Sequence, residues 1–168
     1  MNQPSKFTPV IISSTVIIII SLFPFLNFIN LLCCAGVIIG GAAGTAYYNN
    51  QLKKTGGQIQ YKDGVAIGVL SGIISALIVV IGTTVMTMLV KQNPIPEIYR
   101  MIDMQGLNIP PEIDKFLQQI SDEYSKRGFS ITLTLVTLVV DLISYPIFSA
   151  IGGMLAVQIF GKKKNAAE

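Results

Sequence analysis

The chain has 168 residues, of which 51% are hydrophobic and 12% are charged, and its mean hydropathy is +0.62. This balance excludes an ordinary soluble domain, in which about 25% of residues are charged. The formal net charge of +3 is too small to indicate a nucleic-acid-binding protein. The composition predicts one integral membrane domain over residues 1–168, with the lipid bilayer as its first partner.

The first apolar block has no charged residue between Lys6 and Lys53. As one helix it would measure roughly 69 Å, more than twice the hydrocarbon thickness of about 30 Å. Pro24 and Asn27 supply turn chemistry inside the block. We therefore expect a helical hairpin, with spans over about residues 9–25 and 29–48.

A signal peptide is the alternative interpretation of the first span, because Lys6 precedes an apolar run. The run is followed by Phe23, Pro24 and Phe25, where a cleavage site requires small residues. We therefore expect this segment to stay in the protein as a span.

Two further apolar blocks follow. They predict spans over about residues 64–90 and 131–160, separated by a polar outer loop over residues 91–128. The predicted fold class is all-α: an integral membrane four-helix bundle with an amphipathic helical extracytoplasmic loop.

Lysines in the short connections lie on one side of this four-span topology. They are Lys6, Lys53, Lys54, Lys62 and the tail Lys162–Lys164. By the positive-inside rule, both termini are cytoplasmic and the protein is multi-pass in a bacterial cytoplasmic (inner) membrane.

Prolines divide the outer loop into two predicted helices, at about residues 97–105 and 111–127. The second helix is amphipathic. Its apolar face consists of Ile113, Phe116, Leu117, Ile120 and Tyr124. Such a helix lies on the membrane surface, covers the bundle or binds a partner, and we favour the surface position.

Small residues recur every four positions in spans two and three. These helix-packing candidates are Gly36, Gly40 and Gly44 in span two and Gly64, Gly68, Gly72 and Ala76 in span three. Such repeats allow close backbone contact in membranes, so we expect spans two and three to pair. The alternative is that glycine is simply frequent in membrane helices.

Asp141 is the only ionisable carboxylate or amine inside a predicted span. Such a residue is a possible intramembrane polar site for proton or cation transfer. Counting about 20 residues outward from Lys162 places Asp141 at the outer membrane boundary instead. Its possible hydrogen-bond partners are Ser144, Tyr145, Thr83, Thr84 and Thr87.

Catalytic and cofactor motifs are missing from the sequence. The chain has no histidine and no cysteine besides Cys33 and Cys34, so one chain cannot assemble a zinc, haem or iron–sulfur site or a Ser–His pair. We expect no metal, no cofactor and no enzyme activity.

The whole chain resembles a group of small uncharacterised bacterial membrane proteins classed as a domain of unknown function. The resemblance is carried by Pro24-Phe25-Leu26-Asn27, Leu32-Cys33-Cys34, Gly40-Gly41, Tyr47-Tyr48, residues 62–68, the Pro-Glu-rich outer loop and the lysine tail. It implies bacterial origin and four spans, and it transfers no catalytic residue.

Two function classes are consistent with these features. The first is a structural or accessory membrane component, alone, as a homo-oligomer or with other membrane proteins. The second is a small transporter or channel subunit that uses Asp141.

The topology is testable with fused reporters. A reporter active only in the cytoplasm is expected to work at Thr55 or after Lys164 and to fail at Gly106, because the lysine-rich connections stay inside. Activity at Gly106 would contradict four spans.

Overall fold

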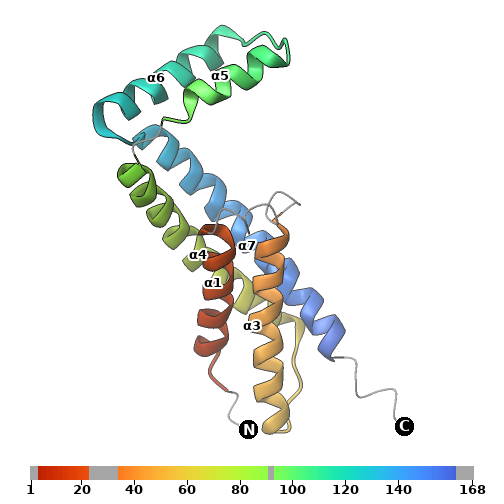
Figure 1. Cartoon of the computed structure of the whole chain (residues 1–168). Helices are drawn as coiled ribbons and strands as arrows, with labels where there is room; N and C mark the ends of the chain where they lie inside the picture. Colours follow the sequence, from red (N-terminus) through yellow and green to blue (C-terminus); the bar gives the residue numbers. More distant parts are fainter. Residues whose placement is uncertain (1–3, 23–33, 91–92, 162–168) are drawn as a thin grey trace. The chain divides into compact units, whose positions relative to one another are not determined.

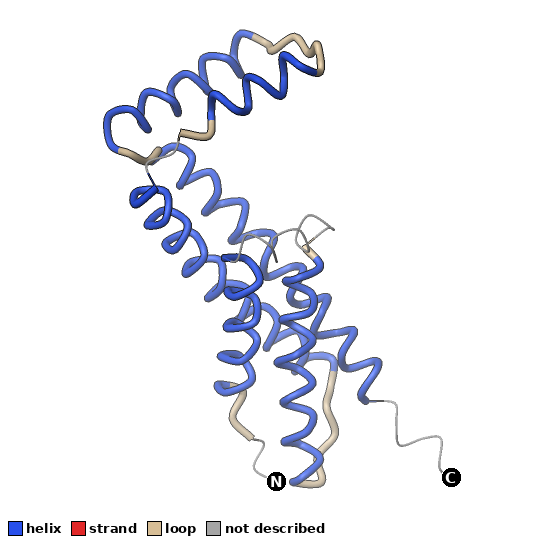
Figure 2. The backbone as a smooth tube through the Cα atoms, in the orientation of Figure 1, coloured by secondary structure: helices blue, strands red, loops and turns tan. Residues whose placement is uncertain are grey.

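The computed structural model describes residues 4–22, 34–90 and 93–161, and its regular elements there are all α-helices (Figures 1 and 2). They are α1 (Phe7–Leu22), α3 (Ala35–Lys54), α4 (Tyr61–Val90), α5 (Ile95–Met104), α6 (Pro111–Arg127) and α7 (Ile131–Gly161). The all-α prediction is confirmed.

The chain forms two compact units. We call residues 1–79 and 140–168 the bundle unit; it contains α1, α3, the first part of α4 and the last part of α7. Residues 80–139 are the hairpin unit, which contains the end of α4, α5, α6 and the start of α7. A single membrane domain over the whole chain stays a prediction.

Two helices, α4 with 30 residues and α7 with 31, are long and apolar enough to cross a membrane. The apolar helix α1 is shorter, with 16 residues. Helix α3 carries Asn49, Asn50, Gln51 and two lysines in its second half. Length and composition thus support two of the four predicted spans.

Several predicted helix boundaries agree with the structure, and others differ. Helix α7 matches the predicted fourth span, and α5 and α6 match the two predicted helices of the loop. Helix α3 continues past the predicted end at Tyr48, because Gly56, with a φ of 73°, is the first residue there with a left-handed backbone. The predicted turn at Pro24 lies outside the described residues.

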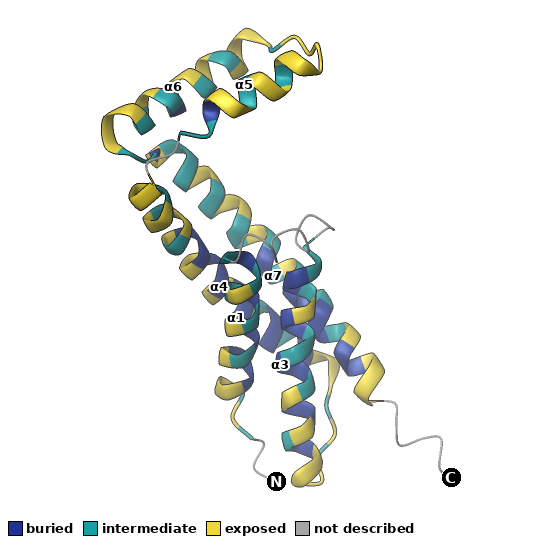
Figure 3. Ribbon diagram, viewed as in Figure 1, coloured by how far each residue is buried: buried dark blue, intermediate teal, exposed yellow. Residues whose placement is uncertain are grey.

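Buried and exposed residues alternate along the helices of the bundle unit (Figure 3). The buried residues include polar side chains, and the exposed ones include large apolar side chains. Ser13, Ser71 and Ser149 are fully buried. Ile39 is 50% exposed and Leu70 is 50% exposed. Soluble proteins show the opposite distribution.

Glycines place α4 directly against α7 in the bundle unit. A Cβ atom added at Gly64 would lie 2.6 Å from the carbonyl oxygen of Gly153, and one at Gly68 would lie 2.5 Å from that of Ser149. A Cβ at Gly72 would lie 2.6 Å from Cα of Pro146. These distances are far below van der Waals contact, so only glycine fits without a backbone shift.

The glycines of α3 contact α1 and α7. A Cβ at Gly44 would lie 2.5 Å from the carbonyl oxygen of Pro9, and one at Gly40 would overlap Ile17. A Cβ at Gly41 would overlap the carbonyl oxygen of Ser149. Helix α3 thus packs against α1 through Gly40 and Gly44 and against α7 through Gly41.

The pairing of α3 with α4 through their glycine faces therefore stays a prediction. The nearest atoms at the glycines of α3 belong to α1 and α7, and those at the glycines of α4 belong to α7. A glycine repeat marks a face that admits a close neighbour, but it does not specify the neighbour. Of the other two candidates, Gly36 is buried in α3, and Ala76 is buried in a cluster with Ile17, Val37 and Tyr145.

Gly68→Ala tests the contact between α4 and α7. We expect it to lower the free energy of unfolding by about 1–3 kcal/mol, because the new methyl group meets backbone atoms of α7. Gly161→Ala is the matched control, since its Cβ would lie 3.6 Å from Ile59. Denaturation of both variants in detergent measures the difference, and equal stability would contradict the close contact.

Candidate functional site: the polar interior of the bundle unit

Three serine hydroxyls from three helices meet in the bundle unit. Ser13 Oγ of α1 lies 2.9 Å from Ser71 Oγ of α4. Ser71 Oγ lies 3.1 Å from Ser149 Oγ of α7. All three residues are fully buried, so these contacts replace hydrogen bonds to water.

The same hydroxyls also reach backbone carbonyls. Ser13 donates to the carbonyl of Gly40 at 2.8 Å, which brings α3 into the network. Ser14 donates to the carbonyl of Ser71 at 3.3 Å, and Ser75 donates to the same carbonyl at 2.7 Å. We call Ser13, Ser14, Ser71, Ser75 and Ser149 the serine cluster; it connects all four helices of the bundle unit.

The serine cluster consists of groups suited to packing. Its contacts join hydroxyls to other hydroxyls and to carbonyls, none of which is a base strong enough to take a serine proton at neutral pH. The cluster therefore stabilises contacts between helices.

The serine cluster was not singled out from the sequence. One signal was available: Ser13, Ser14, Ser71, Ser75 and Ser149 are hydroxyl residues inside otherwise apolar runs. Their convergence depends on how four helices rotate toward one another, which spacing along a single helix does not reveal.

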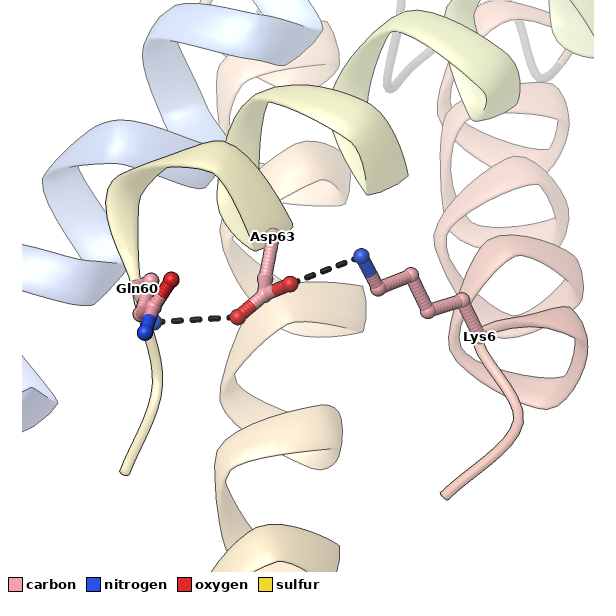
Figure 4. A network of polar contacts seen from close by, with 3 residues as sticks. All are labelled: Lys6, Gln60 and Asp63. Carbon is pink, nitrogen blue, oxygen red and sulfur yellow. Dashed lines mark hydrogen bonds and ion pairs between the residues drawn. The ribbon is translucent and has the colours of Figure 1, made fainter. Parts of the chain in front are cut away.

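A second polar contact lies at the start of α4 (Figure 4). Asp63 is 2% exposed, and its Oδ1 lies 2.7 Å from Nζ of Lys6, which precedes α1. Its Oδ2 accepts a hydrogen bond from the backbone N–H of Gln60 at 3.0 Å. The carboxylate thus caps the first turn of α4, where the helix dipole favours negative charge, and pairs with a cation.

Two buried hydroxyl groups belong to the same unit. Nζ of Lys6 lies 6.0 Å from the ring centroid of Tyr48. Tyr48 and Thr45 are fully buried, and neither hydroxyl has a hydrogen-bond partner among the residues that the structure describes. Buried hydroxyl groups of this kind are usually satisfied by ordered water.

Asp63 was not singled out from the sequence either. The available signal was that Asp63 is the only acidic residue before Glu97. A single acid among several lysines indicates an ion pair, but the sequence does not identify which lysine pairs with it.

Asp141 lies in α7 and is partly buried in the bundle unit. Its carboxylate makes no hydrogen bond or ion pair with any residue in the described ranges. Among its predicted partners, Tyr145 donates to Ser21 at 3.1 Å instead, and Thr84 donates to the carbonyl of Val80 at 2.7 Å. The membrane depth of Asp141 stays a prediction.

In the hairpin unit, Glu123 joins the end of α6 to the start of α7. It accepts hydrogen bonds from Ser130 Oγ at 2.6 Å, Thr132 Oγ1 at 2.6 Å and Thr132 N at 3.0 Å. These donors lower the pKa of Glu123 to about 2, so the carboxylate is charged at every ordinary pH.

The apolar face predicted for α6 is only partly covered in the hairpin unit. Ile120 is buried, whereas Ile113 and Phe116 are exposed. The opposite face contributes to the contact with α5, since Tyr99 donates to Asp114 at 2.7 Å. The surface position of α6 stays a prediction.

Of the two cysteines, only Cys34 belongs to the described residues. Cys34 precedes α3 with a φ of 58°, and Cys33 lies outside the described ranges. Within those ranges, no three histidine, cysteine or acidic residues come together as a possible metal site.

Comparison with protein-family models, with curated proteins and with solved structures found no match. The resemblance to the bacterial membrane family therefore stays a prediction.

Lys6→Met tests the ion pair. We expect it to lower the free energy of unfolding by about 1–2 kcal/mol, because it leaves the buried Asp63 carboxylate without its cation; the partial exposure of Lys6 limits the effect. Adding Asp63→Asn should recover part of the loss, since the buried charge is removed. Lys53→Met, on the exposed end of α3, is the control. If Lys6→Met lowered the free energy of unfolding no more than Lys53→Met, the ion pair would not be stabilising.

Proposed function

We propose that this chain is a multi-pass integral membrane protein with a structural or accessory role and no enzyme activity of its own. The proposed setting is the bacterial cytoplasmic membrane, with four spans and both termini cytoplasmic. Its proposed partners are the lipid bilayer and further membrane proteins or copies of itself.

One observation carries this proposal: the bundle unit buries polar side chains and exposes apolar ones. Ser13, Ser71 and Ser149 are fully buried, while Ile39 and Leu70 are exposed on helices of the same unit. In water, this distribution would expose apolar surface and sacrifice hydrophobic burial. In lipid it costs little, because hydrocarbon chains solvate isoleucine and leucine and cannot solvate hydroxyl groups.

The lengths of the helices are compatible with the proposed spans. Helices α4 and α7, with 30 and 31 residues, measure about 45 Å and exceed the hydrocarbon thickness of about 30 Å. Helix α3 measures about 30 Å. Helix α1, at about 24 Å, is short for a span, and its close contact with α3 at Gly40 and Gly44 supports a paired hairpin.

The use of the hydroxyl groups supports a structural role over catalysis. Ser13 and Ser71 hold neighbouring helices together, and the surrounding backbone is too close to admit a substrate at Gly40, Gly41 or Gly68. A bundle packed at this distance acts as a rigid unit in the membrane.

A small transporter or channel subunit is the second candidate. It is favoured by Asp141, whose carboxylate is partly buried and unbonded among the described residues of an apolar helix. An unpaired carboxylate inside a membrane is costly and is usually retained for proton or cation transfer. A homo-oligomer would supply the path between subunits.

Flux measurements in liposomes distinguish the two candidates. Under the accessory role, we expect no pH- or cation-dependent flux above protein-free liposomes, and Asp141→Asn should leave the melting temperature nearly unchanged, because the amide keeps the shape of the side chain. Asp122→Asn on α6, which is exposed, is the matched control. Flux in the wild type that Asp141→Asn abolishes and Asp122→Asn preserves would establish the transporter instead.

A further inference from the structure

A groove of about 200 Å³ lies in the hairpin unit, between the end of α4 and the start of α7. It is lined by threonines, two aromatic residues and aliphatic residues. The lining residues are Val80, Thr83, Thr84, Thr87, Tyr124, Phe129, Leu133, Thr134 and Thr137. We call it the threonine groove.

Several threonine hydroxyls of this groove donate their protons to backbone carbonyls. Thr84 donates to the carbonyl of Val80 at 2.7 Å, Thr87 to that of Thr83 at 2.8 Å and Thr134 to that of Ser130 at 2.8 Å. With their protons used, these threonines need no polar partner from a ligand. With these protons bonded to the backbone, the groove presents mainly methyl, aliphatic and aromatic groups, which suits a hydrocarbon chain.

A cationic hollow of about 520 Å³ adjoins the threonine groove and shares Tyr124 with it. It is lined by Asn93, Tyr124, Ser125, Lys126, Arg127 and Gly128. Lys126 and Arg127 are exposed, and neither forms an ion pair with a described residue. Glu123, the nearest acid along the chain, is already bonded to Ser130 and Thr132.

We propose that the hairpin unit binds one anionic phospholipid, with its phosphate at Lys126 and Arg127 and an acyl chain in the threonine groove. The inference rests on the proposed membrane function, since it places the groove at the ends of the two helices that are apolar enough to span. Charge complementarity selects this occupant: arginine and lysine bind a phosphodiester, and the adjoining groove accepts the hydrocarbon.

Native mass spectrometry of the full chain in detergent tests the proposal, with equal amounts of dioleoyl-phosphatidylglycerol and dioleoyl-phosphatidylcholine added. The two lipids share acyl chains, so a difference reports the headgroup. We expect the wild type to retain phosphatidylglycerol over phosphatidylcholine by about 10- to 30-fold, as two basic residues predict. Lys126→Gln with Arg127→Gln should remove this preference.

The control is Lys53→Gln with Lys54→Gln, which removes the same charge from the exposed end of α3. It should keep the preference. A groove variant, Thr137→Phe, should reduce retention of the lipid while leaving the melting temperature of the lipid-free protein within a few degrees. The proposed site would be overturned if both double variants lost the preference for phosphatidylglycerol equally. It would also be overturned if Lys126→Gln with Arg127→Gln left the retention of phosphatidylglycerol unchanged.

Two further outcomes separate this inference from the proposed function. Equal retention of both lipids overturns the anionic site and leaves a membrane protein. A chain that is stable without detergent and retains neither lipid overturns both. Displacement of phosphatidylglycerol by inorganic phosphate or glycerol 3-phosphate at equal concentration would also overturn the lipid site, because the acyl chain would then add no affinity.

Discussion

Backbone contact between helices is the constraint on which the bundle unit depends. In the proposed membrane setting, lipid gives apolar helices little reason to associate, so contacts must come from van der Waals packing and interhelical hydrogen bonds at short range. Gly64, Gly68 and Gly72 bring α4 against α7 at distances that exclude even one methyl group. The serine cluster follows from this approach, because a short side chain reaches a neighbouring helix only when the backbones are this close.

The polar interior also explains how the bundle unit holds a carboxylate. Asp63 is nearly inaccessible, but it has a cation at Lys6 and a backbone donor at Gln60, so its charge is compensated at the start of a helix. Asp141 has neither kind of partner among the described residues. The two acids therefore differ in role: the first stabilises a helix start, and the second is the residue on which a transport function would depend.

The hairpin unit is stabilised by a network of a different kind, the hydrogen bonds of the Glu123 carboxylate at the turn between α6 and α7. Glu123 binds Ser130 and Thr132, and so fixes the turn between α6 and α7 through charge-assisted hydrogen bonds. The same bonds direct the Glu123 carboxylate toward the turn, and neither Lys126 nor Arg127 forms an ion pair with a described residue. The position of Glu123 thus bears on both the turn between α6 and α7 and the proposed lipid site.

The sequence by itself determined the helical class, the ends of α7, the two helices α5 and α6, and the small-residue faces of α3 and α4. These are properties of period, length and composition along one segment. Only the tertiary structure decided that Gly40 and Gly44 meet α1, that Gly68 meets α7, and that Ser13, Ser71 and Ser149 converge. The reason is physical: a face pattern gives the direction in which a helix can pack, whereas the partner depends on the rotation and crossing of helices far apart in the chain.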